Sequence, residues 1–311
     1  MWDGRSVPNY MSFSAGGTYG LMYIGMYRAM RDHIEKTSGI SGEEFFDNLK
    51  GVSGVSAGAL AALCLLLDKM DDLHDIFEEK MLNKLVVNPD FALLLQDFGL
   101  SRGDVLRDLI SRLLRNAGIS EEVTFEGLKR LVRRDFVCVA TVLRTSQPMY
   151  FSCKTTPNVK VVDAVYSSMC VPFLFVPHNH DGTLLVDGVL SLSVADAFPP
   201  DETVFVDFDY KDFALPLDTF QQYCIACLTA RAENFWYRRY RCLTLRTYDD
   251  THPCDFSISN KVIGMRIKCG YATTLTRLYL KLVPCIGECI MFVLGVINGS
   301  SQQESEFDDV S

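Results

Sequence analysis

The chain has 311 residues, of which 48% are hydrophobic and 22% are charged. This composition is typical of one large or two modest globular domains. The formal net charge of −9 argues against a general nucleic-acid binder, because such proteins carry basic surfaces that neutralise phosphates. Eleven cysteines are scattered without paired spacing, and no secretory leader precedes them, which predicts reduced thiols in a cytosolic setting.

The chain begins with a predicted strand, a glycine-rich turn and a helix. The strand covers Tyr10–Ser14, and the helix covers Leu21–His33, where apolar residues recur at helical spacing. Between them lies the sequence AGGTYG, residues 15–20. Adjacent glycines after a strand expose backbone N–H groups that can hold a phosphate or an oxyanion. The alternative is a simple strand-to-helix turn, and the G-x-G-x-x-G pattern of dinucleotide-binding proteins is not matched.

The stretch Gly51–Asp68, GVSGVSAGALAALCLLLD, predicts a strand end, a sharp turn and an almost wholly apolar helix. Residues 54–58 fit the G-x-S-x-G spacing of a nucleophile elbow, with Ser56 at its centre. Gly54 and Gly58 let the chain pass close to itself, and the turn leaves the hydroxyl at a helix N-terminus, where negative charge is favoured. Ser56 is therefore a candidate nucleophile, although small residues also recur in turns that only pack helices.

The remainder of the chain alternates between predicted helices and strands, which predicts an α/β fold with a mostly parallel sheet. The S-x-x-D spacing of Ser101 and Asp104 is that of a capping box and predicts a helix start there, whereas Glu126 follows Thr124 one position too early to do the same. Helices are expected over Asp71–Lys84, Asp104–Leu114, Val161–Met169, Phe220–Tyr237 and Lys261–Leu282, and strands over Phe136–Val142, Met149–Cys153, Leu184–Val186, Thr203–Phe208 and Leu243–Thr247.

Ser56 needs a base to take its proton, because a serine hydroxyl alone is a poor nucleophile. Of the five histidines, only His252 lies downstream of both Ser56 and Asp187, as the Ser-Asp-His order requires, but its polar loop is typical of a surface histidine. The second candidate is Asp187, which follows an apolar strand and precedes Gly188. An Asp-Gly pair also suits an ordinary turn, so the residues alone leave both bases open.

Together these segments resemble the patatin-like phospholipase family, over about residues 8–275. The resemblance rests on the joint order of four parts, with a weaker echo from Asp255 to Tyr271 that is similar to the family's C-terminal helix. The four parts are the glycine turn with Gly16, Gly17 and Gly20, the elbow Gly54–Gly58, the stretch Ala164–Pro177 and the aspartate motif Leu185–Val189.

The resemblance implies a three-layer α/β/α fold with a mostly parallel central sheet, and a Ser-Asp dyad without histidine. Ser56 would attack an acyl ester while Asp187 takes its proton, and backbone N–H groups around Gly16, Gly17 and Thr18 would hold the oxyanion. It also implies a lipid ester as substrate and no cofactor. Because the sequence contains no calcium-binding pattern, we expect activity without a metal.

Three positions depart from the family pattern. Ala15 stands where the family has the first of three glycines, Tyr19 stands at its usual Lys or Arg, and Val189 replaces Gly or Ala. Tyr19 removes a cation that could neutralise a substrate phosphate, which puts a phospholipid preference in doubt more than it does ester hydrolysis. Two alternatives follow, a Ser-His-Asp esterase that uses His252 and a catalytically weak lipid-binding protein of the same fold.

The C-terminal third suggests contact with lipid. Phe235–Arg241 interleaves aromatic residues with arginines, which suits an anionic membrane surface or a half-buried helix end. Leu282–Ile297 carries one charge, Glu288, and its 16 residues fall short of the roughly 20 that span a bilayer. We expect a cytoplasmic, peripherally membrane-associated protein, in which a domain over 8–275 is followed by an apolar extension over 276–299 and a disordered acidic tail over 300–311. No protein partner is indicated.

Overall fold

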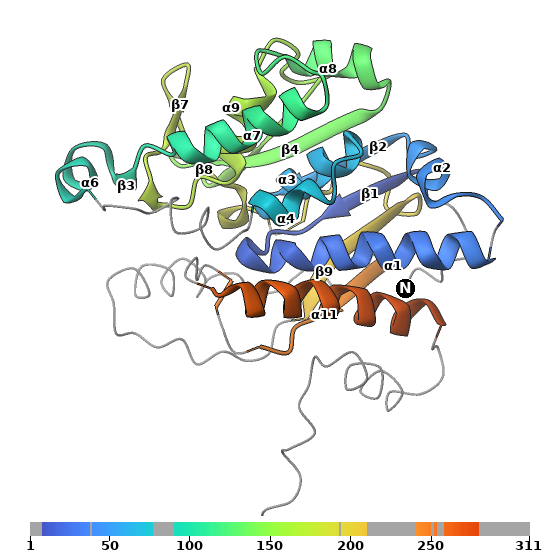
Figure 1. Ribbon diagram of the computed structural model, residues 1–311. Helices are drawn as coiled ribbons and strands as arrows, with labels where there is room; N and C mark the ends of the chain where they lie inside the picture. Colours follow the sequence, from blue (N-terminus) through green and yellow to red (C-terminus); the bar gives the residue numbers. More distant parts are fainter. Residues whose placement is uncertain are drawn as a thin grey trace, which may run out of the picture.

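The structure is a computed structural model that describes residues 8–37, 39–76, 90–192, 194–209, 241–249, 252–253 and 258–279. Figure 1 shows a central sheet with helices packed along it. The predicted helix Phe220–Tyr237, the apolar stretch Leu282–Ile297 and the acidic tail lie outside the described residues. The division of the chain at residue 275 therefore stays a prediction.

The central sheet is mixed and mostly parallel. Within the described part of the chain, seven of its eight strands follow the order β10-β9-β1-β2-β4-β8-β7, and the eighth, β5, pairs with β4 beside this path. The first five strands pair in parallel, whereas β5, β7 and β8 are antiparallel to their neighbours. The predicted α/β fold is thus confirmed. The strands are β1 Tyr10–Phe13, β2 Gly51–Val55, β4 Asp135–Val142, β5 Gln147–Ser152, β7 His178–His180, β8 Thr183–Asp187, β9 Thr203–Asp209 and β10 Arg241–Arg246.

The core lies on both faces of this sheet. Successive residues of β2, β4 and β9 are buried, which requires cover on either side because neighbouring side chains of a strand point to opposite faces. Helix α3 is buried at every residue, as its uncharged sequence predicts. The helices are α1 Met22–Thr37, α2 Gly42–Asp47, α3 Ala57–Leu66, α4 Asp72–Ile76, α6 Phe91–Asp97, α7 Asp104–Asn116, α8 Phe125–Val132, α9 Val161–Ser168 and α11 Asn260–Tyr279.

The N-caps of two helices differ from expectation, although α7 starts at Asp104 as predicted. Helix α7 begins at Asp104, but its N-cap is Gly103, and Ser101 lies in β3 (Gly99–Ser101), which pairs with β6 (Phe173–Phe175). The expected capping box is therefore wrong, since the Ser101 hydroxyl accepts from the Gly103 N–H instead. Thr124 does cap α8, accepting from the Gly127 N–H at 3.2 Å, because N-capping needs only a side-chain oxygen and not the later glutamate.

Helices α1 and α11 lie side by side with their backbones in direct contact (Figure 1). A Cβ added at Gly25 would lie 1.9 Å from the carbonyl oxygen of Ile267, and one at Gly270 would lie 2.0 Å from that of Met22. Only glycine permits this approach, because a methyl group cannot displace backbone. The contact fixes α11 against the start of α1, directly after the glycine turn.

We expect Gly270→Ala to lower the free energy of unfolding by about 1–3 kcal/mol, because the added methyl group overpacks the contact between α1 and α11. The matched control is Gly264→Ala on the same helix, where nothing lies within 4 Å of the new Cβ. That variant should be neutral or stabilising by about 0.5–1 kcal/mol, since alanine favours helix over glycine. Urea unfolding measures both, and equal effects of the two substitutions would contradict the packing described.

Candidate active site

Ser56 occupies a strained turn between β2 and α3. Its φ of 54° and ψ of −126° place a side-chain-bearing residue where L residues rarely lie. A Cβ at Gly54 would lie 2.1 Å from the Gly58 carbonyl oxygen, and one at Gly58 would lie 2.4 Å from that of Phe13. Both glycines are thus required by contact, and the second brings the elbow against the end of β1, where the glycine turn begins.

The Ser56 hydroxyl donates a hydrogen bond of 2.7 Å to Oδ2 of Asp187. Asp187 ends β8, which is antiparallel to β4 and pairs Asp187 with Ala140. Because β4 also pairs with β2, the sheet itself places the two residues together across 131 positions of sequence. Ser56 makes no hydrogen bond to His252 or to any other histidine of the described residues.

Burial controls the acidity of Asp187, which is 1% exposed. Desolvation raises its pKa from 3.8 to about 7, although hydrogen bonds from the Val189 N–H, at 2.9 Å, and from Ser56 favour the charged form. An ordinary aspartate is too weak a base to hold a proton at neutral pH. A carboxylate that titrates near pH 7 can accept a proton and return it, which general base catalysis requires.

The residues before β6 support both members of this pair. Ser168 at the end of α9 accepts the Ser56 N–H at 2.9 Å and donates to the carbonyl oxygen of Val139 at 2.6 Å. The carbonyl oxygen of Cys170 accepts the Asp187 N–H at 2.8 Å. The sequence indicated this stretch only by family resemblance, since a serine that bonds to distant backbone has no local pattern.

The glycine turn, η1 (Gly17–Leu21) with Gly16 before it, packs beside the start of α3. Gly17 has a φ of +51°, and a Cβ there would lie 2.3 Å from the Pro253 carbonyl oxygen. That same oxygen accepts the Thr18 N–H at 2.7 Å, so this predicted oxyanion donor already has a partner. Within the described residues, the N–H groups of Gly16 and Gly17 have no acceptor and stay available.

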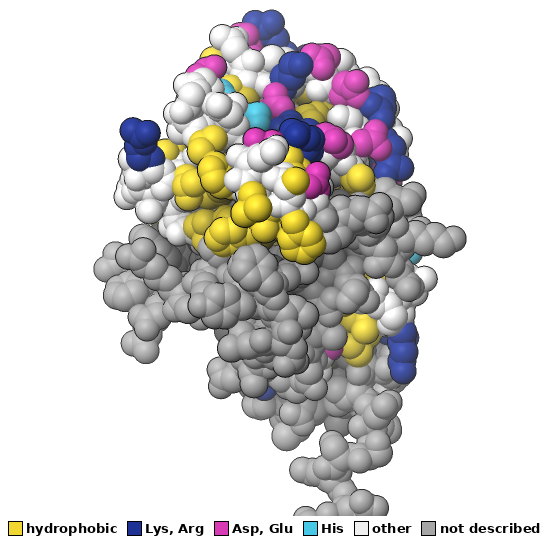
Figure 2. All heavy atoms as spheres, turned by 90° about the vertical axis from the view of Figure 1, so that its left-hand side faces the viewer, with side chains coloured by type: hydrophobic (Ala, Val, Ile, Leu, Met, Phe, Trp, Pro, Cys, Tyr) yellow, Lys and Arg dark blue, Asp and Glu magenta, His cyan; other side chains and the backbone are white. Residues whose placement is uncertain are grey.

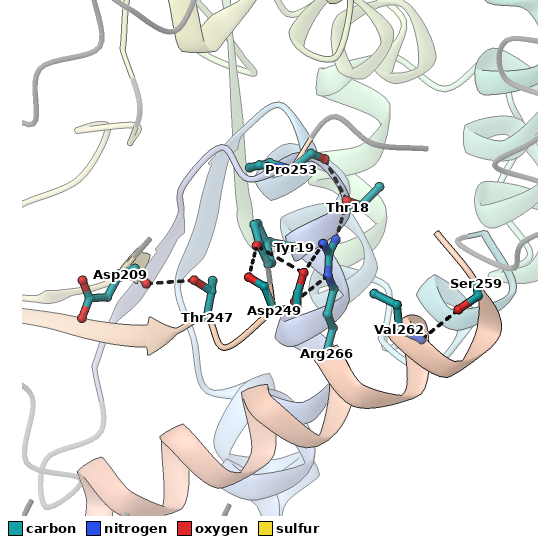
Figure 3. A network of polar contacts seen from close by, with 9 residues as sticks. All are labelled: Thr18, Tyr19, Asp209, Thr247, Asp249, Pro253, Ser259, Val262 and Arg266. Carbon is teal, nitrogen blue, oxygen red and sulfur yellow. Dashed lines mark hydrogen bonds and ion pairs between the residues drawn. The ribbon is translucent and has the colours of Figure 1, made fainter. Parts of the chain in front are cut away.

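The Tyr19 side chain points into the protein interior, away from solvent. It is fully buried, and Figure 3 shows its side chain beside Arg266 and Asp249. Burial raises the pKa of Tyr19, so the phenol stays neutral and donates to Asp249. The departure from a basic residue therefore has a structural role. Neither Arg266 nor Asp249 was a candidate from sequence, where nothing local marks them.

No group of three or more His, Cys, Asp or Glu side chains within the described ranges is arranged to hold a metal ion. The site consists instead of a serine hydroxyl, a buried carboxylate and backbone N–H groups. Such a set can carry out acyl transfer, in which a nucleophile, a base and an oxyanion site are needed within reach of one carbonyl.

Comparison with known proteins places the chain in a family. The chain is 24% identical over 280 residues to an uncharacterised protein of Acanthamoeba polyphaga mimivirus, which covers 84% of this chain and 90% of that protein. It is 26% identical over 179 residues to a cGAMP-activated phospholipase of Vibrio cholerae, covering 54% of this chain and 49% of that protein.

The crystal structure of VipD from Legionella pneumophila is similar in fold, with a TM-score of 0.53 and 16% identity over 88% of this chain and 67% of that one. The family model of patatin-like phospholipases matches residues 11–204, more than half of the chain. That range contains the glycine turn, Ser56 and Asp187, and the protein belongs to the patatin-like phospholipase family.

Proposed function

We propose that the protein is a lipid acyl hydrolase of the phospholipase A or lipase type that acts in lipid metabolism or membrane remodelling. The observation that carries this proposal is the 2.7 Å hydrogen bond from the Ser56 hydroxyl to a buried carboxylate with a pKa near 7. The family and the cGAMP-activated phospholipase of Vibrio cholerae support a lipid ester as the substrate.

The reaction proceeds through an acyl-enzyme. Asp187 takes the proton of Ser56 as its oxygen attacks the ester carbonyl, and the N–H groups of Gly16 and Gly17 stabilise the oxyanion that forms. Protonated Asp187 then gives its proton to the departing alcohol. In the second half, Asp187 takes a proton from water, which attacks the acyl-enzyme and releases the fatty acid, and the proton returns to Ser56.

Exposed apolar side chains gather at the end of the molecule that carries α6 and β3. Figure 2 looks at this end and shows hydrophobic atoms grouped together on it. The apolar rim consists of Phe91, Leu95 and Phe98, which are 64%, 83% and 60% exposed, and Phe173, which is 41% exposed. Phe98 precedes Gly99, the pairing partner of Phe173 between β3 and β6.

The apolar rim adjoins the proposed catalytic pair along the chain. Phe173 follows Ser168 by five residues and Cys170 by three, and these two residues bond to the backbone of Ser56 and Asp187. Phe98 and Phe173 both have positive φ, a conformation that bulky residues rarely adopt. No described helix has the length and apolar composition to cross a bilayer. Because its large apolar side chains are exposed together, we assign the rim to contact with a lipid surface that delivers substrate.

Ser56→Ala and Asp187→Asn should each abolish ester hydrolysis, because the first removes the nucleophile and the second removes the base. The matched control is His252→Ala, which should keep activity near wild type, since Ser56 does not bond to that histidine. Turnover of a soluble ester measures the complete reaction, and labelling by a fluorophosphonate measures whether Ser56 is reactive. Loss of activity in His252→Ala equal to that in Ser56→Ala would favour a triad, and an unlabelled wild type would favour a lipid-binding protein without catalysis.

Catalytic efficiency should rise with pH through about 7 and level off above it, because Asp187 must be ionised to take the proton and burial raises its pKa to about 7. A pH profile of kcat/KM on a soluble ester measures this. A histidine base titrates in a similar range, so the profile is repeated on His252→Ala, which should keep the same inflection. An inflection near 3.8, the ordinary value for aspartate, would contradict the assignment.

The double variant Phe91→Ser with Leu95→Ser should lower hydrolysis of phosphatidylcholine vesicles at least about tenfold, since each apolar side chain buried in lipid contributes about 1.5–3 kcal/mol. Hydrolysis of a soluble short-chain ester should not change. Leu131→Ser is the matched control, because Leu131 is 63% exposed and belongs to α8, which lies away from α6 in Figure 1. Equal losses of vesicle hydrolysis in the double variant and in Leu131→Ser would contradict a role of the apolar rim in lipid contact.

A further inference from the structure

Arg266 on α11 is a charged side chain with no exposed surface. Its Nε donates to Oδ2 of Asp249 at 3.2 Å, and its Nη2 donates to Oδ1 at 2.9 Å. Both oxygens of the carboxylate are thus engaged by one guanidinium in a paired geometry. An arginine in this position is tolerated only when its donors are satisfied, so the protein maintains the pair against a considerable desolvation cost.

The third nitrogen of the guanidinium contacts the glycine turn (Figure 3). Nη1 of Arg266 donates to Oγ1 of Thr18, and the guanidinium carbon lies 4.0 Å from the centre of the Tyr19 ring. The Tyr19 hydroxyl reaches back to Oδ1 of Asp249 at 3.4 Å. One buried ion pair therefore contacts two consecutive residues of the turn, by a hydrogen bond at one and by a cation–π interaction at the other.

Thr18 also bonds to a second segment of the chain, at Pro253. Its hydroxyl accepts from Arg266 and donates to the carbonyl oxygen of Pro253 at 2.8 Å, while its N–H donates to the same oxygen at 2.7 Å. Hydrogen bonds thus hold the glycine turn to Arg266 of α11 and to Pro253. The N–H groups of the neighbouring Gly16 and Gly17 have no acceptor within the described residues.

Arg266 does not act on substrate as a cation. Its side chain has no exposed surface and its charge is opposed by Asp249 at hydrogen-bond distance, so little of its field reaches a phosphate in solvent. It also does not restore the basic residue that Tyr19 displaces, since its guanidinium is buried against Thr18 and Tyr19. Its influence on the reaction therefore passes through the position of the turn.

We propose that Arg266 is a positioning residue for the oxyanion site, holding Thr18 and Tyr19 so that the N–H groups of Gly16 and Gly17 face the carbonyl attacked by Ser56. This inference rests on the proposed hydrolase function. Donors to an oxyanion act by being fixed before the charge forms, and a displacement of about 1 Å can cost on the order of 100-fold in rate. Without these contacts from Arg266 the turn could adopt other conformations, because its glycines are conformationally permissive.

The test compares Arg266→Lys, Arg266→Gln and Thr18→Val, measuring kcat and KM on a soluble ester and the rate of phosphonylation by a fluorophosphonate. We expect Arg266→Gln to lower kcat at least about tenfold with KM within about twofold, because the donors act on the transition state. Phosphonylation should slow in parallel, since its tetrahedral adduct places an oxygen in the same site. Arg266→Lys should lose less activity than Arg266→Gln, because lysine keeps a positive charge to pair with Asp249.

Thr18→Val separates positioning from folding, because it removes the hydroxyl while the buried pair of Arg266 and Asp249 stays complete. It should also lower kcat without changing KM, and it should lower the melting temperature less than Arg266→Gln does, because only one donor of Arg266 loses its partner. The matched control is Arg134→Gln, an arginine with 16% of its side chain exposed that bonds to the carbonyl oxygens of Phe46 and Leu66, away from the turn. That variant should lose stability but keep kcat per folded molecule.

The outcomes separate the two proposals. Wild-type kcat and phosphonylation rates in Thr18→Val and Arg266→Lys would overturn the positioning role while leaving the hydrolase proposal in place. Wild-type protein that neither turns over an ester nor is phosphonylated would overturn both. Equal losses in Arg134→Gln and Arg266→Gln, measured per folded molecule, would show that a general loss of packing explains the effect and would also overturn the inference.

Discussion

The hydrogen bond between Ser56 and the buried carboxylate of Asp187 is the interaction around which the other features are arranged. It requires the positive φ of Ser56, two glycines that tolerate close backbone, and a strand that runs against its neighbour. Burial that raises the pKa of Asp187 to about 7 also has a cost in stability. As the pH rises from the unfolded value of 3.8 through about 7, the folded state retains a proton that the unfolded chain has lost, and this group's contribution to stability declines.

Local patterns in the sequence were sufficient for the features that depend on neighbouring residues. The spacing of small residues around Ser56 predicted the elbow, because strain and close approach in a turn are decided within a few positions. The uncharged run after it predicted the buried helix α3, and the alternation of helices with strands predicted the mostly parallel sheet. The sequence predicted a strand that ends just before Asp187, and β8 ends at that residue. Only family resemblance favours Asp187 over His252 as the candidate base.

The features that sequence reasoning missed are decided by distant residues. Ser101 satisfies the spacing of a capping box but is drawn into β3 by pairing with Phe175. The Thr18 N–H, counted among the oxyanion donors, is used by a carbonyl 235 positions away in sequence, at Pro253. Arg266 has no neighbours in sequence that mark it, and its place is set by the contact of α11 with α1. Buried polar networks of this kind specify one geometry, since each member left unpaired would be costly.

The contact between Thr18 and Arg266 joins residues 248 positions apart, across the whole described fold. During synthesis, the glycine turn, Ser56 and Asp187 leave the ribosome well before α11 does. A nascent chain can therefore pair β1, β2, β4 and β8 and bring Ser56 and Asp187 together before α11 contacts the glycine turn. The order of translation makes the packing of α11 on α1 the late step that completes the proposed oxyanion site.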